Sequence, residues 1–424
     1  METIALVIHP FLKAERVKGR SIASRLEEVV GLAGAINLDV RLQEAVSITR
    51  INAGTYFGKG TVERIRKLVA EYQIEVVCID TSISPVQQRS LEKTIDAKVI
   101  DRTGLILEIF GERAVTKEGV LQVELAHLKY QRSRLVRTWT HLERQRGGVG
   151  FLGGPGETQI EADRRIISDR IGKIEKELQT VRRTRKLHRR ARGRIPYPIV
   201  ALVGYTNAGK SSLFNTLTNS KVLAKDLLFA TLDPKMRQLK LPSRRSIILS
   251  DTVGFVSELP TMLIASFRAT LEEVIAADVI IHVRDISHPD TEAQKQDVLK
   301  VLDELGVDVT DELKFIEVLN KTDLLETHDL LRIQNIAMRN KKVVPLSAKT
   351  GENADWLIRE VDELLALERT VVTLKLPYAE GKGMAWLYRN AEVLERKDLL
   401  DCAEFRVLMF SQELERFQKN FNNL

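Results

Sequence analysis

The stretch Gly204-Tyr205-Thr206-Asn207-Ala208-Gly209-Lys210-Ser211 decides the fold of this chain, because it is a complete G-x-x-x-x-G-K-S phosphate loop. The apolar run from Ile199 to Val203 precedes it and predicts a buried strand, and residues 211–219 behind it predict a helix. Glycine lets the backbone curl until successive N–H groups converge on phosphate, and the helix N-terminus adds partial positive charge. Strand, loop and helix together predict a nucleoside triphosphate site in an α/β fold.

Two short motifs further along the chain also follow apolar runs. Asp251-Thr252-Val253-Gly254 comes after Ile247 to Ser250, and Asn320-Lys321-Thr322-Asp323 comes after Phe315 to Leu319. Ligands of a doubly wound sheet bind at the carboxyl ends of its strands. We therefore expect both motifs to join the phosphate loop in one site.

Size and composition limit the number of domains and the class of protein. With 424 residues, 44% apolar and 29% charged, the chain is expected to form two to four globular domains. Its two cysteines, Cys78 and Cys402, lack metal-ligand spacing and favour a reducing compartment. No apolar run approaches 18 residues, so we expect a cytoplasmic protein without a membrane span.

The net charge of +7 is unevenly distributed. Residues 111–197 carry 21 Lys and Arg against 10 Asp and Glu, whereas the rest carries 44 against 48. A concentrated basic field is typical of a protein that binds a polyanion.

The order of patterns along the chain predicts four domains. Residues 1–110 alternate strand-like and helical runs, which predicts a small α/β subdomain, and 111–195 predict a long, basic, antiparallel helical hairpin. Residues 196–368 contain the motifs and predict a P-loop domain with a mixed, mostly parallel sheet, and 369–424 predict a small α/β domain. The glycine-rich stretch 54–60 lacks the Ser or Thr of a phosphate loop, which favours a structural turn.

The predicted hairpin has an apolar seam and an unusual tip. In its second helix Ile167, Ile171, Ile174, Leu178 and Val181 recur at coiled-coil spacing. The connection, residues 147–156, has six glycines in ten residues, with Phe151 and Leu152 between them. An arm that inserts into a partner and a plain connecting loop both remain open.

Basic residues crowd the end of the second helix. Residues 182–194 hold eight Lys and Arg with no acidic residue among them. Such density is self-repelling unless an anion compensates, which favours RNA phosphate over a solvated helix face. The expected RNA contacts are Arg144, Arg146, Arg182, Arg183, Arg185, Lys186, Arg189, Arg190, Arg192 and Arg194.

The three motifs in this order resemble the small GTPase superfamily over about residues 198–366. The resemblance implies that Asn320 and Asp323 recognise guanine, since a carboxylate accepts from the ring N–H and the amine that adenine lacks in that arrangement. It assigns Mg²⁺ to Ser211, to Thr231 and, through water, to Asp251. The residues it assigns to GTP are Gly204, Tyr205, Thr206, Asn207, Ala208, Gly209, Lys210, Ser211, Phe229, Ala230, Thr231, Leu232, Asp233, Asp251, Thr252, Val253, Gly254, Asn320, Lys321, Thr322, Asp323, Ser347, Ala348 and Lys349.

One position departs from many of these relatives. They carry a water-orienting glutamine after D-x-x-G, whereas this chain has Phe255, so intrinsic hydrolysis is expected to be slow. The resemblance places Thr231 and Gly254 at the γ-phosphate. Asn207 resembles the asparagine with which some GTPases hold K⁺ near the phosphates, although it could equally cap the turn.

Taken whole, the chain closely resembles the HflX family, on the basic hairpin, the stretch Gly147 to Glu161, the phosphate loop, Phe57-Gly58-Lys59-Gly60 and Asp101-Arg102-Thr103. The resemblance implies a monomeric GTPase that binds GTP, GDP and the rRNA of the large (50S) ribosomal subunit and splits stalled or idle ribosomes. The alternatives are a ribosome-assembly GTPase and a regulatory scaffold that acts on membrane proteins, both without splitting activity; a peripheral location at the membrane stays open beside the cytoplasmic one. The sequence departs from the family at Lys235-Met236-Arg237, where threonines commonly precede the arginine.

Overall fold

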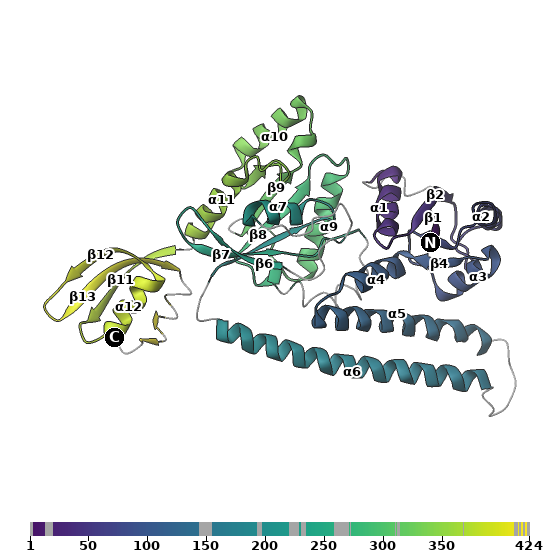
Figure 1. The fold of residues 1–424 in the computed structure, drawn as a ribbon, viewed down its shortest axis with the longest axis horizontal. Helices are drawn as coiled ribbons and strands as arrows, with labels where there is room; N and C mark the ends of the chain where they lie inside the picture. Colours follow the sequence, from purple (N-terminus) through teal and green to yellow (C-terminus); the bar gives the residue numbers. More distant parts are fainter. Residues whose placement is uncertain are drawn as a thin grey trace. The chain divides into compact units, whose positions relative to one another are not determined.

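The computed structural model describes residues 3–12, 20–143, 155–192, 197–219, 229, 235–257, 271, 273–309, 311, 314–367, 369–410, 414, 417, 418, 420 and 421. The chain forms two compact units, Met1–Leu239 with Ser246–Ala354 and Lys240–Arg245 with Asp355–Leu424. The predicted fold class, a P-loop domain preceded by a small α/β subdomain and a helical hairpin, is confirmed (Figure 1).

The N-terminal part of the first unit is an α/β subdomain built on a parallel sheet. Its strands lie in the order β2-β1-β3-β4, and each neighbouring pair is parallel. The helices between them start with ordinary signals: Ser84 and Gln87 form a capping box, and Pro85 occupies the first turn. Its elements are β1 (Ile4–Leu12), α1 (Ile22–Gly34), β2 (Asp39–Ile48), α2 (Lys59–Tyr72), β3 (Val76–Ile79), α3 (Pro85–Ile95) and β4 (Lys98–Asp101).

The glycine-rich stretch at residues 54–60 leads into α2. Phe57 is completely buried in the core of the subdomain, and the Asn52 side chain accepts a hydrogen bond from the Gly54 amide at 2.8 Å. These contacts account for the stretch as a structural turn.

Three helices follow, α4 (Arg102–Arg113), α5 (Lys117–Glu143) and α6 (Pro155–Arg192). α5 and α6 run antiparallel, as expected (Figure 1). The predicted seam forms: Leu121 and Leu125 of α5 pack with Ile171, Ile174 and Leu178 of α6. Because apolar residues repeat every three or four positions, burying them aligns the two helices along their length. Residues 144–154, including Phe151 and Leu152, lie outside the described ranges.

The rest of the first unit is built on a six-stranded sheet in the order β10-β9-β8-β5-β7-β6. The four pairs from β10 to β7 are parallel. Only residues 241–245 connect β6 to β7, and so short a connection requires an antiparallel pair. The elements are β5 (Ile199–Gly204), α7 (Lys210–Thr218), β6 (Lys235–Lys240), β7 (Ser246–Asp251), β8 (Val279–Asp285), α9 (Thr291–Glu304), β9 (Phe315–Asn320), η2 (Thr322–Leu324), α10 (Thr327–Arg339) and β10 (Val343–Pro345).

The second unit has an antiparallel sheet in the order β11-β13-β12. Its core consists of Leu376, Leu387, Phe405, Val407 and Phe417 with their neighbours. The elements are α11 (Ala354–Leu367), β11 (Arg369–Pro377), α12 (Gly381–Asn390), β12 (Glu392–Asp398) and β13 (Cys402–Phe410). Among the helices of both units, over their described residues, none combines the length and apolar character needed to cross a membrane.

Candidate nucleotide site

The phosphate loop connects the carboxyl end of β5 to the start of α7, as the motif predicts. Three of its residues have a positive φ, namely Gly204 with 155°, Asn207 with 60° and Gly209 with 93°. A side chain at Gly209 would also overlap the amide of Asn320. Glycine is therefore required at this position for both its backbone conformation and its lack of volume.

Lys210 holds the loop in its curled form. Its ammonium donates hydrogen bonds to the carbonyl oxygens of Tyr205 at 2.7 Å and Gly204 at 3.1 Å. Burial lowers the pKa of Lys210 to about 8, and the carboxylate of Asp251 opposes that shift. The positive charge is thus buried beneath the loop, where the outer phosphates of a nucleotide would compensate it.

Ser211 and Asp251 form an oxygen pair suited to Mg²⁺. The Ser211 hydroxyl donates to Oδ2 of Asp251 at 2.8 Å, and Asp251 is completely buried at the end of β7. Mg²⁺ prefers oxygen ligands and keeps several of its waters. The residues present therefore fit the ion; Ser211 would bind it and Asp251 would hold one of its waters.

The motif that ends in Gly254 lies directly against the phosphate loop. A Cβ on Gly254 would come within 2.9 Å of the Thr206 methyl and 3.0 Å of the Lys210 ammonium nitrogen. Two backbone hydrogen bonds join the segments: Thr206 N–H donates to the Phe255 carbonyl at 2.7 Å, and Phe255 N–H donates to Gly204 at 3.1 Å. Loop and motif, about 50 residues apart in sequence, thus share one wall of the site.

The base-reading motif sits at the end of β9. The Asn320 side chain donates to the Ala208 carbonyl at 2.7 Å and accepts from the Ala348 amide at 2.9 Å. The Ser347 hydroxyl donates to the Asp323 carboxylate at 2.6 Å. Asn320 therefore ties the phosphate loop to the segment of Ser347 to Lys349, and this arrangement orients Asp323 at the edge of the site.

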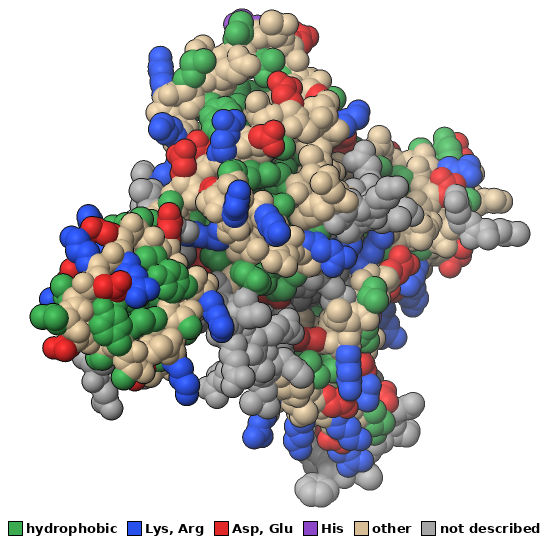
Figure 2. Space-filling view, turned by 60° about the vertical axis from the view of Figure 1, so that its left-hand side comes forward, with side chains coloured by type: hydrophobic (Ala, Val, Ile, Leu, Met, Phe, Trp, Pro, Cys, Tyr) green, Lys and Arg blue, Asp and Glu red, His purple; other side chains and the backbone are tan. Residues whose placement is uncertain are grey.

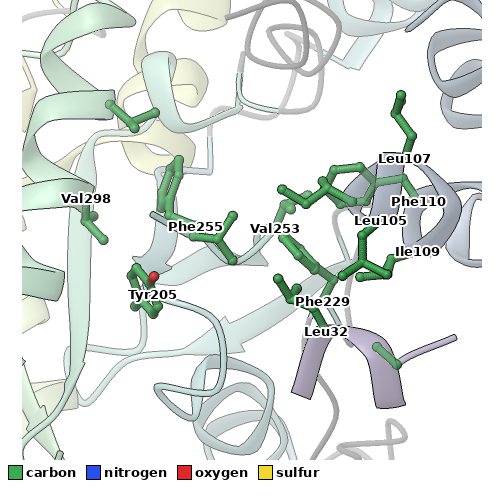
Figure 3. Packing of buried hydrophobic residues seen from close by; sticks show 14 of the residues in the cluster. Leu32, Leu105, Leu107, Ile109, Phe110, Tyr205, Phe229, Val253, Phe255 and Val298 are labelled. Carbon is green, nitrogen blue, oxygen red and sulfur yellow. The ribbon is translucent and has the colours of Figure 1, made fainter. Parts of the chain in front are cut away.

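The structure brings together the predicted residues of the phosphate loop, of 251–254, of 320–323 and of 347–349. The Phe229 side chain instead lies in an apolar cluster, with its ring 4.7 Å from that of Phe110 and inclined by 69° (Figure 3). The residues that lie outside the described ranges are Ala230, Thr231, Leu232, Asp233, Arg144, Arg146 and Arg194. α6 extends through Arg192, but the side chains of Arg182, Arg185, Lys186, Arg189, Arg190 and Arg192 are not among those described.

Sequence reasoning missed a group of polar residues behind the phosphate loop. The Tyr205 hydroxyl donates to Glu28 at 2.6 Å and accepts from the Ser257 amide at 2.7 Å. Arg102 donates to the carbonyl and the hydroxyl of Ser257, both at 2.9 Å, and pairs with Glu28. Glu28 and Arg102 belong to the N-terminal α/β part, so this network joins it to the phosphate loop and the segment after Gly254. The only sequence signal was Arg102 itself, within Asp101-Arg102-Thr103.

The buried ammonium makes nucleotide affinity depend on pH. Above pH 8 Lys210 loses its proton in the free protein, whereas bound phosphates favour the charged form. We expect GDP binding at pH 9 to take up protons, and its affinity to fall by up to about tenfold per pH unit above pH 8. Calorimetry in two buffers of different ionisation enthalpy measures the uptake. Lys210→Gln should abolish it, and an absence of uptake in the unmodified protein would contradict the assignment.

Comparison with known proteins agrees with this geometry. Four family models match consecutive segments: GTP-binding GTPase N-terminal over residues 23–111, GTP-binding GTPase Middle Region over 113–192, 50S ribosome-binding GTPase over 199–321, and HflX C-terminal domain over 332–421. The crystal structure of SsGBP in complex with GDP is similar with a TM-score of 0.51 and 25% identity, covering 86% of this chain and 98% of that one.

Two relatives are similar to this chain over most of its length. GTPase HflX of Magnetococcus marinus is 47% identical over 393 residues, which cover 93% of this chain and 90% of that protein. GTPase HflX of Escherichia coli K12 is 43% identical over 334 residues, covering 79% and 77%. With its phosphate loop, its Asp251 and Asn320 motifs and these relatives, the chain belongs to the HflX family of GTPases.

Proposed function

We propose that this GTPase binds the rRNA of the large ribosomal subunit and, in its GTP form, separates the subunits of stalled or idle ribosomes. The observation that carries the proposal is the net excess of eleven basic residues in 111–197, immediately before the GTPase domain. The match of residues 199–321 to the 50S ribosome-binding GTPase model supports the same partner.

The position of the charge within the hairpin favours an RNA contact at one end of α6. Along the seam, basic residues are balanced by acidic ones: Arg170 pairs with Glu124 at 2.7 Å, and Lys129 pairs with Glu175 at 3.0 Å. Residues 182–194 contain no acidic residue. On the face visible in Figure 2, acidic side chains lie among the basic ones. RNA phosphates would supply the missing counter-charge.

The site supports GTP as the nucleotide. Asn320 is held by two hydrogen bonds and Asp323 by one, so both would be oriented before guanine binds. A carboxylate left without a partner costs free energy, and adenine offers none in this arrangement.

Hydrolysis requires help from outside the motif. The ring of Phe255 is 4% exposed and packs in the apolar cluster, so it cannot orient water. We propose that K⁺ held by Asn207, or the bound ribosome, offsets the charge that develops during phosphoryl transfer, with Mg²⁺ at Ser211 and Asp251.

The ribosome contact can be tested with matched triple variants of α6. Replacing Arg189, Arg190 and Arg192 by alanine should weaken co-sedimentation with large subunits by about tenfold or more and reduce its salt dependence. The control replaces Arg164, Arg165 and Lys173, which lie on the same helix among acidic residues, and should bind normally.

Light scattering of intact ribosomes then measures splitting directly. The GTP-loaded protein should lower the scattering, and the first triple variant should not. Binding to large subunits without any fall in scattering would favour an assembly factor, and no salt-sensitive binding at all would favour the scaffold.

The monovalent ion can be tested by single-turnover hydrolysis. K⁺ should accelerate hydrolysis by about tenfold or more relative to Na⁺ because a cation near the phosphates offsets transition-state charge. Asn207→Ala should remove the difference. If hydrolysis in Na⁺ without ribosomes is as fast as hydrolysis in K⁺ with ribosomes, the proposed activation by K⁺ or the ribosome is refuted.

Guanine recognition can be tested with Asp323→Asn. An amide donates where the carboxylate accepted, so the variant should bind GTP about a hundredfold more weakly and prefer xanthosine triphosphate, whose 2-oxo group accepts. Competition binding with both nucleotides measures the switch. Unchanged GTP affinity would refute the assignment of Asp323.

A further inference from the structure

Thr206, the third residue of the phosphate loop, has a buried side-chain hydroxyl. Thr206 is 6% exposed, and among the described residues none forms a hydrogen bond with its Oγ1. Buried polar side-chain atoms normally have a partner, and each exception needs an explanation, such as an ordered water, an ion, local strain or a catalytic role. Nothing in the packing of the loop explains a hydroxyl here, because valine has the same shape without it.

The position of the side chain identifies what it would meet. Its methyl lies 2.9 Å from the point where a Cβ on Gly254 would be, and the Lys210 ammonium lies 3.0 Å from the same point. The lysine of a phosphate loop reaches the β- and γ-phosphates. The Thr206 methyl therefore faces the region of the Lys210 ammonium, and the hydroxyl is carried by the same Cβ.

The backbone of Thr206 is already engaged. Its N–H donates to the Phe255 carbonyl at 2.7 Å, and the Tyr205 hydroxyl accepts from the Ser257 amide at 2.7 Å. These bonds hold the loop against the segment after Gly254 and use the N–H of Thr206, so this N–H is not available to a substrate.

The same bonds keep Phe255 out of the site. Its ring lies among buried apolar side chains that include Tyr205 and Val253 (Figure 3). Where many GTPases have a glutamine that orients water, this chain therefore has an apolar ring turned into the core. A polar group near the attacking water has to come from another residue.

We propose that the Thr206 hydroxyl is that group: it accepts a hydrogen bond from the attacking water and donates one to a γ-phosphate oxygen. A hydroxyl has one donor and two acceptor positions, so it can do both at once. The water oxygen bonds to the γ-phosphorus, the bond from that phosphorus to the bridging oxygen of GDP breaks, and the water proton passes to a phosphate oxygen. The products are GDP and inorganic phosphate, and threonine is unchanged.

The test compares Thr206→Val, which removes the hydroxyl and keeps the shape, with Thr206→Ser, which keeps the hydroxyl. The rate of single-turnover hydrolysis is measured in the full chain, with and without large subunits. It should fall about a hundredfold in the valine variant, and it should stay within about threefold of the normal rate in the serine variant. GDP affinity is measured for both variants, so that a loss of nucleotide binding is distinguished from a loss of hydrolysis. Binding of GDP with aluminium fluoride, which mimics the transferring phosphoryl group, should be lost only in the valine variant.

Two results would overturn the proposal. One is hydrolysis at the normal rate in Thr206→Val, and the other is equal slowing in the valine and serine variants, which would make the side chain a packing element only. If valine also impairs folding or GDP binding, Thr206→Ala replaces it in the comparison. Serine faster than alanine by about tenfold or more then supports the proposal, and equal rates refute it.

Discussion

The parallel pairing of β5 with both β7 and β8 is the constraint on which the site depends. β5 lies between the other two strands, with Leu202 opposite Asp251 on one side and Gly204 opposite Val283 on the other. All three strands therefore end at the same edge of the sheet, where the chain can leave to either face. The phosphate loop, the Asp251 motif and, one strand further along, Asn320 meet there because the ladder places them there.

Buried charge is the second feature of this edge. Lys210 and Asp251 are both removed from solvent, and the loop carbonyls and the Ser211 hydroxyl are their immediate polar neighbours. Such a site is preorganised for an anion and a divalent ion, since both charges are already desolvated before they bind. The network of Glu28, Arg102 and Tyr205 extends this polar region into the N-terminal α/β part.

That network also gives the GTPase a physical connection to the rest of its unit. Ser257 lies three residues after Gly254 and is held by Arg102 through both its carbonyl and its hydroxyl. A movement of the Gly254 segment on nucleotide binding would have to break or carry these bonds. Such coupling would relate the nucleotide state to the N-terminal α/β part, to which Glu28 and Arg102 belong.

Much of this protein was predictable because its signals are local. Residues 204–211 form a phosphate loop in any strand-to-helix context, and the spacing of Ile171, Ile174 and Leu178 defines a helical seam whatever its partner. The order of the motifs predicted which strand ends carry the site.

Only the tertiary structure decided which side chains lie against the phosphate loop and which are turned into the core. Phe255 turns into the core, and the Thr206 hydroxyl has no hydrogen bond with any residue that the structure describes, because of contacts between segments about 50 residues apart. Glu28 meets Tyr205 across 177 residues of chain. The sequence by itself determined which chemical groups are available to the site, since each motif consists of residues that are adjacent in the sequence. Folding decided how that chemistry is oriented, because orientation depends on packing between distant segments.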